Sequence, residues 1–300
     1  MSAATTAPVE SASRLATVRP RRDVTLWSRF RKHRLAVVGL FVLLVMILIA
    51  IAAPLLAPYD PNSVSLSDYR KPPSAEHWLG TDSQGRDVLS RLMYAARVSL
   101  SVGIGAVAIY VVIGTILGGV AGYFGGWIDN VIMRLADMVL SFPSIIVIIT
   151  LVSILGPSIL NVILVIGLLG WPPIARLVRG EFLTLRERDF VVASRSIGAP
   201  SGRIIARHIF PNATTPVIVN ATFGMASAIL LEAGLSFLGL GVQPPTASWG
   251  NILNAAQSIT ILEEMPWLWL PPGAAIVVAV LAINTLGDGL RDALDPRSRR

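Results

Sequence analysis

Side chains able to do catalytic or ligand-binding chemistry are few in this sequence, and they lie far apart. The three histidines, His33, His77 and His208, stand in separate segments without the paired spacing of a metal site. The sequence contains no G-x-x-x-x-G-K-[ST] phosphate loop, no H-E-x-x-H pair and no cluster of Asp and Glu. We therefore expect no catalytic residue, no metal site, no cofactor bound by this chain and no ATP hydrolysis by it.

One polar segment, residues 181–212, has the composition of a docking site for another protein. It reads EFLTLRERDFVVASRSIGAPSGRIIARHIFPN and lies between two apolar stretches. Its Gly and Pro residues predict two short helices, one at about 185–197 ended by Gly198, and one from Pro200 to Pro211. A helix docked on a second protein and an amphipathic helix on anionic lipid explain these residues about equally well.

Three residues within apolar stretches are candidates for a solute pathway or gate: Glu232, Pro143 and Pro172. An acidic side chain inside a membrane span is costly, so Glu232 needs a partner. We expect an ion pair with Arg91 or Arg97, and a cationic group of a solute is the alternative. Prolines bend or interrupt helices, which suits a gate but is also common in membrane bundles.

Small residues and charges in two predicted spans indicate how the helices pack. Gly114, Gly118 and Gly122 recur at intervals of four, a spacing that lets helix backbones approach closely. Asp137 follows Arg134 by three residues, so the two can pair on one helix face. Both features are interpreted as structural.

The elements that position these residues are membrane helices. Hydrophobic residues make up 53% of the chain and charged residues 14%, and the mean hydropathy is +0.66, which together exceed the values of a soluble domain. A spanning helix needs about 20 apolar residues. Six stretches meet this need, and they lie at about 35–57, 98–124, 132–155, 159–179, 213–240 and 266–287.

The distribution of Arg and Lys predicts the orientation of these six spans. Of the 25 Arg and Lys residues, 20 lie on the side of both termini and of the 181–212 loop, which places that side in the cytoplasm. The basic residues flank the membrane, so nucleic-acid binding is not expected. The sequence divides into a disordered tail at 1–34, a transmembrane domain at 35–290 and a tail at 291–300. Within the outer segment 59–97, the residues from Arg86 to Arg97 alternate apolar and polar side chains at helical spacing, which predicts an amphipathic helix lying on the outer face.

Part of the 181–212 loop resembles the Glu-Ala-Ala, Gly, Leu-Pro signature of permease subunits from binding-protein-dependent ABC importers. The matching residues are Ala193, Gly198 and Pro211, with the Gly-to-Pro spacing of thirteen intact. Val192 stands in place of the Glu, Ser194 in place of the second Ala, and Phe210 in place of the Leu. Residues 77–100 and 232–253 resemble the dipeptide, oligopeptide and nickel branch, and the resemblance extends from Leu35 to Pro296.

This resemblance implies an all-α chain of six transmembrane helices with the type I, methionine-importer-like, permease fold. It also implies a heterodimer with a second homologous permease, two ATPase subunits that bind ATP and Mg²⁺, and an extracytoplasmic substrate-binding protein. The 181–212 loop then carries a coupling helix that contacts an ATPase. The contact residues implied are Phe190, Val192, Ala193, Ser194, Arg195, Ile197, Gly198, Ala199 and Pro211.

The function implied is import of di- or oligopeptides, or of a related solute such as a nickel chelate, through the plasma membrane. An ion-coupled secondary transporter that needs no partner is the alternative. It predicts an inverted repeat and acidic residues near the midplane, and the first, second and fourth spans contain no acidic residue. A membrane anchor without transport leaves the proline-rich helices and the long loop unexplained.

Overall fold

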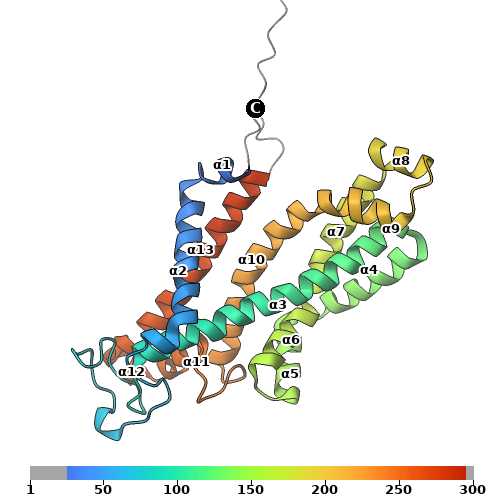
Figure 1. The fold of residues 1–300 in the computed structure, drawn as a ribbon. Helices are drawn as coiled ribbons and strands as arrows, with labels where there is room; N and C mark the ends of the chain where they lie inside the picture. Colours follow the sequence, from blue (N-terminus) through green and yellow to red (C-terminus); the bar gives the residue numbers. More distant parts are fainter. Residues whose placement is uncertain (1–25, 295–300) are drawn as a thin grey trace, which may run out of the picture.

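The computed structural model describes residues 26–294, and over that range the chain consists of helices and connecting loops (Figure 1). No strand occurs in this range, which contains one β-type bridge, between Thr81 and Asp87. The all-α fold class predicted from the sequence is confirmed. Most of the predicted tail 1–34, and the end of the predicted tail 291–300, lie outside the described residues.

The α-helices are α1 Leu26–Phe30, α2 Arg34–Leu56, α3 Val88–Phe124, α4 Gly126–Ser141, α5 Ser144–Leu155, α6 Ile159–Leu169, α7 Trp171–Arg186, α8 Asp189–Ser196, α9 Ser201–Ile204, α10 Phe210–Phe237, α11 Trp249–Leu253, α12 Ile259–Glu264 and α13 Leu270–Leu294. Short 3-10 turns lie at Leu66–Asp68, Asn254–Gln257 and Pro266–Leu268, and a π-helical turn lies at Ile205–Ile209.

Within the described range, five helical stretches are long and apolar enough to cross a membrane. They are Arg34–Leu56, Val88–Phe124, Ile159–Arg186, Ser201–Phe237 and Leu270–Leu294. A sixth candidate is the pair of α4 and α5, whose axes meet at 84°. The predicted number of six spans therefore agrees with the structure when this bent pair counts as one span.

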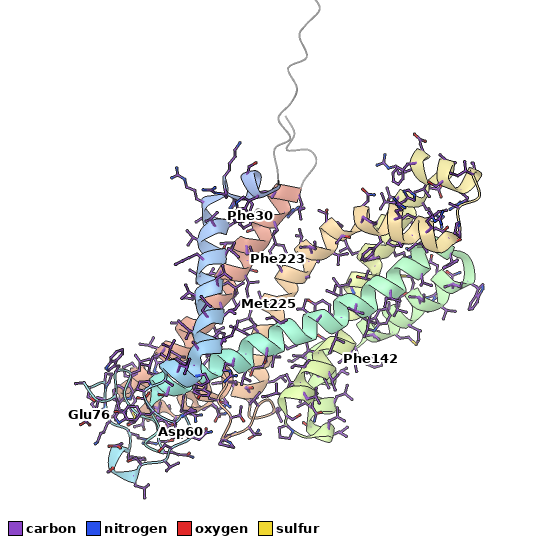
Figure 2. The ribbon with its side chains drawn as sticks, in the orientation of Figure 1. Phe30, Asp60, Glu76, Phe142, Phe223 and Met225 are labelled. Atoms are coloured by element: carbon purple, nitrogen blue, oxygen red, sulfur yellow. The ribbon has the colours of Figure 1, made fainter. Side chains whose placement is uncertain are left out.

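The break between α4 and α5 has its cause in Pro143. Phe142, labelled in Figure 2, has the extended φ of −96° and ψ of 139°, as expected for a residue that precedes proline. One helix over 132–155 was predicted, and the structure divides it at this point. The interruption at Pro143 therefore has the local cause that the sequence indicated.

The long helix α3 begins at Val88, before the predicted span at 98–124. The prediction of a separate helix on the outer face for the last residues of segment 59–97 is wrong, because these residues form the first turns of α3. The Asp87 side chain accepts a hydrogen bond of 2.7 Å from the backbone N–H of Ser90 and caps the helix. The Arg91 side chain is buried and does not face water. It donates a hydrogen bond of 3.2 Å to the Pro61 carbonyl of the outer segment.

The helix that begins at Ser201 continues through Pro211, although the sequence predicted that Pro211 would end it. The Phe210 N–H donates to the Ile205 carbonyl, five residues back. Such a wider π turn leaves room for the ring of Pro211, which would clash with a carbonyl in a regular α-helix. The helical stretch consequently runs from Ser201 to Phe237.

Helix α3 crosses the whole molecule and packs against most of the other long helices (Figure 1). Its closest neighbour is α7, because Gly114, Gly118 and Gly122 present bare backbone to that helix. A Cβ on Gly122 would lie 2.7 Å from the carbonyl oxygen of Arg179. The absence of side chains at these positions thus allows the close packing of α3 on α7.

The molecule has two ends, and they differ in structure (Figure 1). Helix α1, the end of α13 and helix α8 lie at one end, and the outer segment 57–87 lies with α12 at the other. At the first end, His33 Nε2 lies 3.5 Å from Asp292 Oδ2, linking the start of α2 to α13. Both termini of the described chain are thus on the side of α8.

Candidate functional site

Helix α8 carries most of the residues for which an ATPase contact was predicted. Phe190, Val192 and Ile197 are exposed, and the Ile197 side chain has 86% of its surface free. Ala193, Arg195 and Gly198 are exposed too, while Ser194 and Ala199 are half-buried. Pro211 lies apart from this group, at the start of α10. Exposed apolar side chains at the tip of a helical arm form a surface that suits a partner protein.

Short-range contacts fix the shape of α8. The Ser194 hydroxyl donates to the Phe190 carbonyl at 2.7 Å, and Gly198 ends the helix with a φ of +80°, which glycine adopts without strain. The Val191 side chain is fully buried and anchors α8 on the rest of the molecule. The sequence did not single out Val191 as the anchor, because its neighbours Phe190 and Val192 are also apolar.

Two ion pairs tie α4 to α7, the helix that leads into α8. Arg179 binds Asp129 with two hydrogen bonds, of 2.5 Å from Nε and 2.6 Å from Nη2. Arg176 Nη2 lies 2.6 Å from Asp137 Oδ1. The predicted pair of Arg134 and Asp137 is wrong, because the neighbouring helix supplies the cation that Asp137 contacts. Because α3 also packs on both of these helices, α3, α4 and α7 form one packed unit next to α8.

Two cavities lie at the break between α4 and α5. One has a volume of about 510 Å³ and is lined by Pro143, Ser144 and mostly apolar residues such as Phe142. The other has a volume of about 180 Å³ and lies between α5, α6, α3 and α10, where Tyr110 and Ser227 contribute hydroxyl groups. Ser144 lines both cavities, so the first residue of α5 lies between them. Pro172, the other proline predicted for the gate, lies at the start of α7 and lines neither cavity.

Glu232 has no cationic partner in the described part of the chain. Its carboxylate accepts hydrogen bonds of 2.9 Å from the Ser99 hydroxyl and 2.7 Å from the Ser236 hydroxyl. The predicted ion pair with Arg91 or Arg97 is therefore wrong. Both arginines lie on the first turns of α3 and have other partners: Arg91 lies 3.6 Å from Asp82, and Arg97 lies over the Tyr94 ring. The Glu232 side chain is fully buried where α10 packs on α3.

The same two serines hold the loop that follows α10. Ser99 Oγ accepts the backbone N–H of Trp249 at 3.3 Å, and Ser236 Oγ accepts that of Val242 at 3.0 Å. Because these backbone groups belong to segment 241–253, Glu232 connects that segment to two membrane helices. Its burial also argues against direct contact with a solute.

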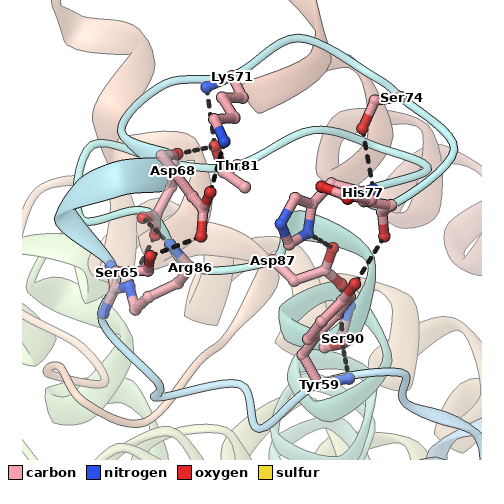
Figure 3. Close-up of polar contacts among 12 residues, drawn as sticks. Tyr59, Ser65, Asp68, Lys71, Ser74, His77, Thr81, Arg86, Asp87 and Ser90 are labelled. Atoms are coloured by element: carbon pink, nitrogen blue, oxygen red, sulfur yellow. Dashed lines mark hydrogen bonds and ion pairs between the residues drawn. The ribbon is translucent and has the colours of Figure 1, made fainter.

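The outer segment is held by a polar network around Asp87 (Figure 3). Asp87 Oδ1 lies 3.0 Å from His77 Nδ1, and Asp87 Oδ2 accepts the Ser90 hydroxyl at 2.7 Å. That hydroxyl also accepts the backbone N–H of Tyr59 at 3.2 Å. His77 is thus a buried structural residue.

A second set of charges holds the remainder of this segment. Asp82 lies 2.8 Å from Arg86 Nε and 3.6 Å from Arg91 Nε. A hydrogen bond from the Lys71 ammonium, 2.6 Å long, lowers the pKa of the Asp68 carboxyl below its usual value. The outer segment is therefore an ordered platform, and none of its charges is aimed at the cavities near α5.

In the range 26–294, no three His, Asp or Glu side chains come together in a way that could hold a metal ion. The candidate functional regions are one exposed surface, one ordered outer segment and two cavities. These are the α8 surface at one end, the platform at the other and, between them, the two cavities that Ser144 lines.

A protein-family model described as the inner membrane component of binding-protein-dependent transport systems matches residues 114–300. The chain belongs to this family. A second model, described as the N-terminal transmembrane domain of oligopeptide transport permease C, matches residues 20–73. The family has the type I importer permease fold, so the resemblance found in the sequence is confirmed.

Relatives of this chain are named for peptide transport. The chain is 48% identical over 271 residues to a putative peptide permease protein of Brucella suis, and the match covers 90% of each. It is 43% identical over 274 residues to the dipeptide transport system permease protein of Bacillus subtilis, over 91% of this chain and 85% of the relative. It is also 43% identical over 272 residues to the glutathione transport system permease protein of Escherichia coli, over 90% of this chain and 89% of the relative. The protein is thus a multi-pass membrane subunit of an ABC importer.

Proposed function

We propose that this chain forms one half of the membrane pathway of an importer for short peptides, and that α8 couples it to ATPase subunits. The peptide assignment is supported by relatives named for dipeptide and glutathione transport that match along nine-tenths of the chain. A related solute such as a nickel chelate is the alternative cargo. The second half of the pathway is supplied by a homologous permease.

The observation that carries the coupling role is the surface of α8. Its apolar side chains are exposed, whereas Val191 anchors the helix on a packed unit. A short helix fixed in this way transmits a push from a partner to α7 and α3 as a rigid movement. Two ATPase chains, one below each permease, bind ATP and Mg²⁺ and supply that push. This chain contributes no catalytic group to hydrolysis.

The end of the molecule that carries α8 and both termini faces the cytoplasm in this proposal. Arginines are concentrated there, at Arg186, Arg188, Arg195, Arg203 and Arg207, as the positive-inside rule requires. The platform at the opposite end then receives the substrate-binding protein. Exposed aromatic side chains on this platform, Tyr69 and Trp78, are suited to such a contact.

The test is uptake by the intact complex, purified mildly from its own cells and reconstituted in liposomes with its binding protein. We expect uptake of labelled alanyl-alanine that requires ATP and is unaffected by collapse of the proton and sodium gradients. Uptake that follows an ion gradient without ATP would instead establish the secondary transporter. Uptake of a nickel chelate in place of the dipeptide would correct the cargo and leave the coupling intact.

A further inference from the structure

The break at Pro143 leaves the start of a helix uncapped beside a cavity. Helix α5 has 12 residues, and no side chain caps its first turn. The backbone N–H groups of Ser144 and Ile145 have no hydrogen-bond partner in the described part of the chain. Such free groups, together with the helix dipole, give the start of a helix a partial positive charge.

An independent feature of the same cavity is the hydroxyl group of Tyr110. The Tyr110 side chain is 7% exposed and lines the cavity of about 180 Å³. Its hydroxyl makes no hydrogen bond within residues 26–294, and its oxygen is not fully enclosed, so it is free to bond a ligand in the cavity. Gly224, across from it on α10, leaves the room that this hydroxyl occupies, since a Cβ there would collide with the hydroxyl oxygen.

The chemistry of the cavity selects for an anion. Its free donors are the hydroxyls of Tyr110 and Ser144 and the two N–H groups, whereas the Ser227 hydroxyl already donates to the Phe223 carbonyl at 3.2 Å. No carboxylate lines the cavity, so a cationic group would find no charged acceptor in it. Hydrogen-bond donors at a helix start, in surroundings of low dielectric constant, bind an anionic group of a ligand.

We infer that this cavity receives the carboxylate of a passing solute, which for a peptide is its C-terminal carboxylate. The inference rests on the proposed function and adds a binding site to it. The volume suits a carboxylate and the atoms next to it. The adjoining apolar cavity of about 510 Å³, which shares Ser144, is placed to hold a side chain of the same solute.

The test compares alanyl-alanine with its C-terminal amide, which lacks the negative charge. Both are titrated by saturation-transfer NMR against the permease and ATPase complex without binding protein, so that the permeases alone select the ligand. Tyr110→Phe removes only the hydroxyl. Ser144→Pro removes the hydroxyl and a free N–H at a helix position where proline is favoured, and Ser144→Ala removes the hydroxyl alone.

Two control variants make the same kind of substitution at residues outside the cavities. Tyr94→Phe alters a tyrosine of the same helix outside the cavity. Ser141→Ala alters a serine before the break, whose hydroxyl donates to the Met138 carbonyl. Neither residue lines either cavity.

We expect wild type to bind the free acid about tenfold more tightly than the amide, since hydrogen bonds to a charged group are the stronger ones. Tyr110→Phe and Ser144→Pro each weaken binding of the acid by about tenfold and leave the amide unchanged, while the controls match wild type. Equal binding of acid and amide, or no binding, would overturn the inference. ATP-dependent uptake by the same preparation shows separately whether the proposed function stands.

Discussion

Glu232 illustrates how one residue joins elements that are distant in sequence. Each of its two serine partners gives its only proton to the carboxylate and uses its oxygen to accept a backbone N–H. The carboxylate therefore orients both hydroxyls at once. At Gly250, a Cβ would lie 2.6 Å from the Ala233 Cα, so α11 packs directly on α10 at the same place. Glu232 is thus an anchor for segment 241–253.

Replacing Glu232 by Gln tests this role. The amide offers one acceptor oxygen, so the serine that faces its NH₂ group loses the acceptor for its proton. We expect Glu232→Gln to lower the stability of the complex by roughly 1–3 kcal/mol. Hydrogen exchange of segment 241–253 will be faster in the variant, and thermal unfolding will begin at a lower temperature.

The control for this experiment is Glu263→Gln, which changes an exposed carboxylate of α12. It should leave both measurements unchanged. If Glu232→Gln exchanges as slowly and unfolds as late as wild type, the carboxylate does not hold this segment.

Sequence reasoning found the acidic residue but assigned the wrong partners to it. An acidic residue inside a span signals a need for compensation, and the outer arginines were the nearest charges. The actual partners are neutral, and Ser99 lies 133 residues away along the chain. Serines inside a span give no signal of their own, so only the fold identifies them. The burial of His77 with Asp87 is likewise visible only in the fold.

Among the elements, the contact between α3 and α7 depends most directly on particular residues. Gly118 lies against the backbone of Ala175, and a Cβ on it would collide with the carbonyl oxygen of that residue. The interval of four that the sequence shows is the spacing at which α3 faces α7. This contact bears on the proposed coupling, because α7 leads directly into α8.

Gly118→Ala will push α3 away from α7. We expect a loss of stability of roughly 1–3 kcal/mol, the usual cost of overpacking, together with reduced ATP-dependent uptake. Thermal unfolding of the complex and the uptake assay measure the two effects.

A matched change on α7 is Gly180→Ala, where a Cβ meets nothing within 4 Å. It will be neutral or stabilising by up to about 1 kcal/mol, because alanine favours a helix over glycine. Equal effects of Gly118→Ala and Gly180→Ala would show that the close approach of α3 to α7 is unimportant.

The helices themselves were largely predictable, and their ends were not. Apolar runs locate the spans because a bilayer demands about 20 such residues. The start of α3 at Val88 depends on the platform that buries Arg91 and on the cap by Asp87, which the span pattern does not contain. The continuation through Pro211 depends on a π turn, a local adjustment that proline alone would not predict. The helix α8 was predicted, although its extent was shorter than expected.

At the scale of the whole molecule, the structure separates three regions along one axis. The α8 surface lies at one end, the cavities with Ser144 lie in the middle, and the platform lies at the other end. Helix α3 extends over 37 residues between these regions and packs on α7, α10 and α2. In the proposed mechanism, α3 carries a movement imposed at α8 to the cavities and the platform. We propose this as the route by which ATP hydrolysis on partner subunits acts on the solute.

The contact between α8 and the ATPases is the central claim, and native mass spectrometry of the mildly extracted complex tests it most directly. The variant is Val192→Asp with Ile197→Asp, which places charges on the exposed side of α8 while Val191 stays in place. Its matched control is Ile259→Asp, an exposed isoleucine of α12 at the opposite end. We predict that wild type and the control retain a second permease and two ATPase chains, whereas the α8 variant keeps the permease and loses the ATPases. An α8 variant that retains both ATPases, or a wild-type chain that never carries them, would contradict the account.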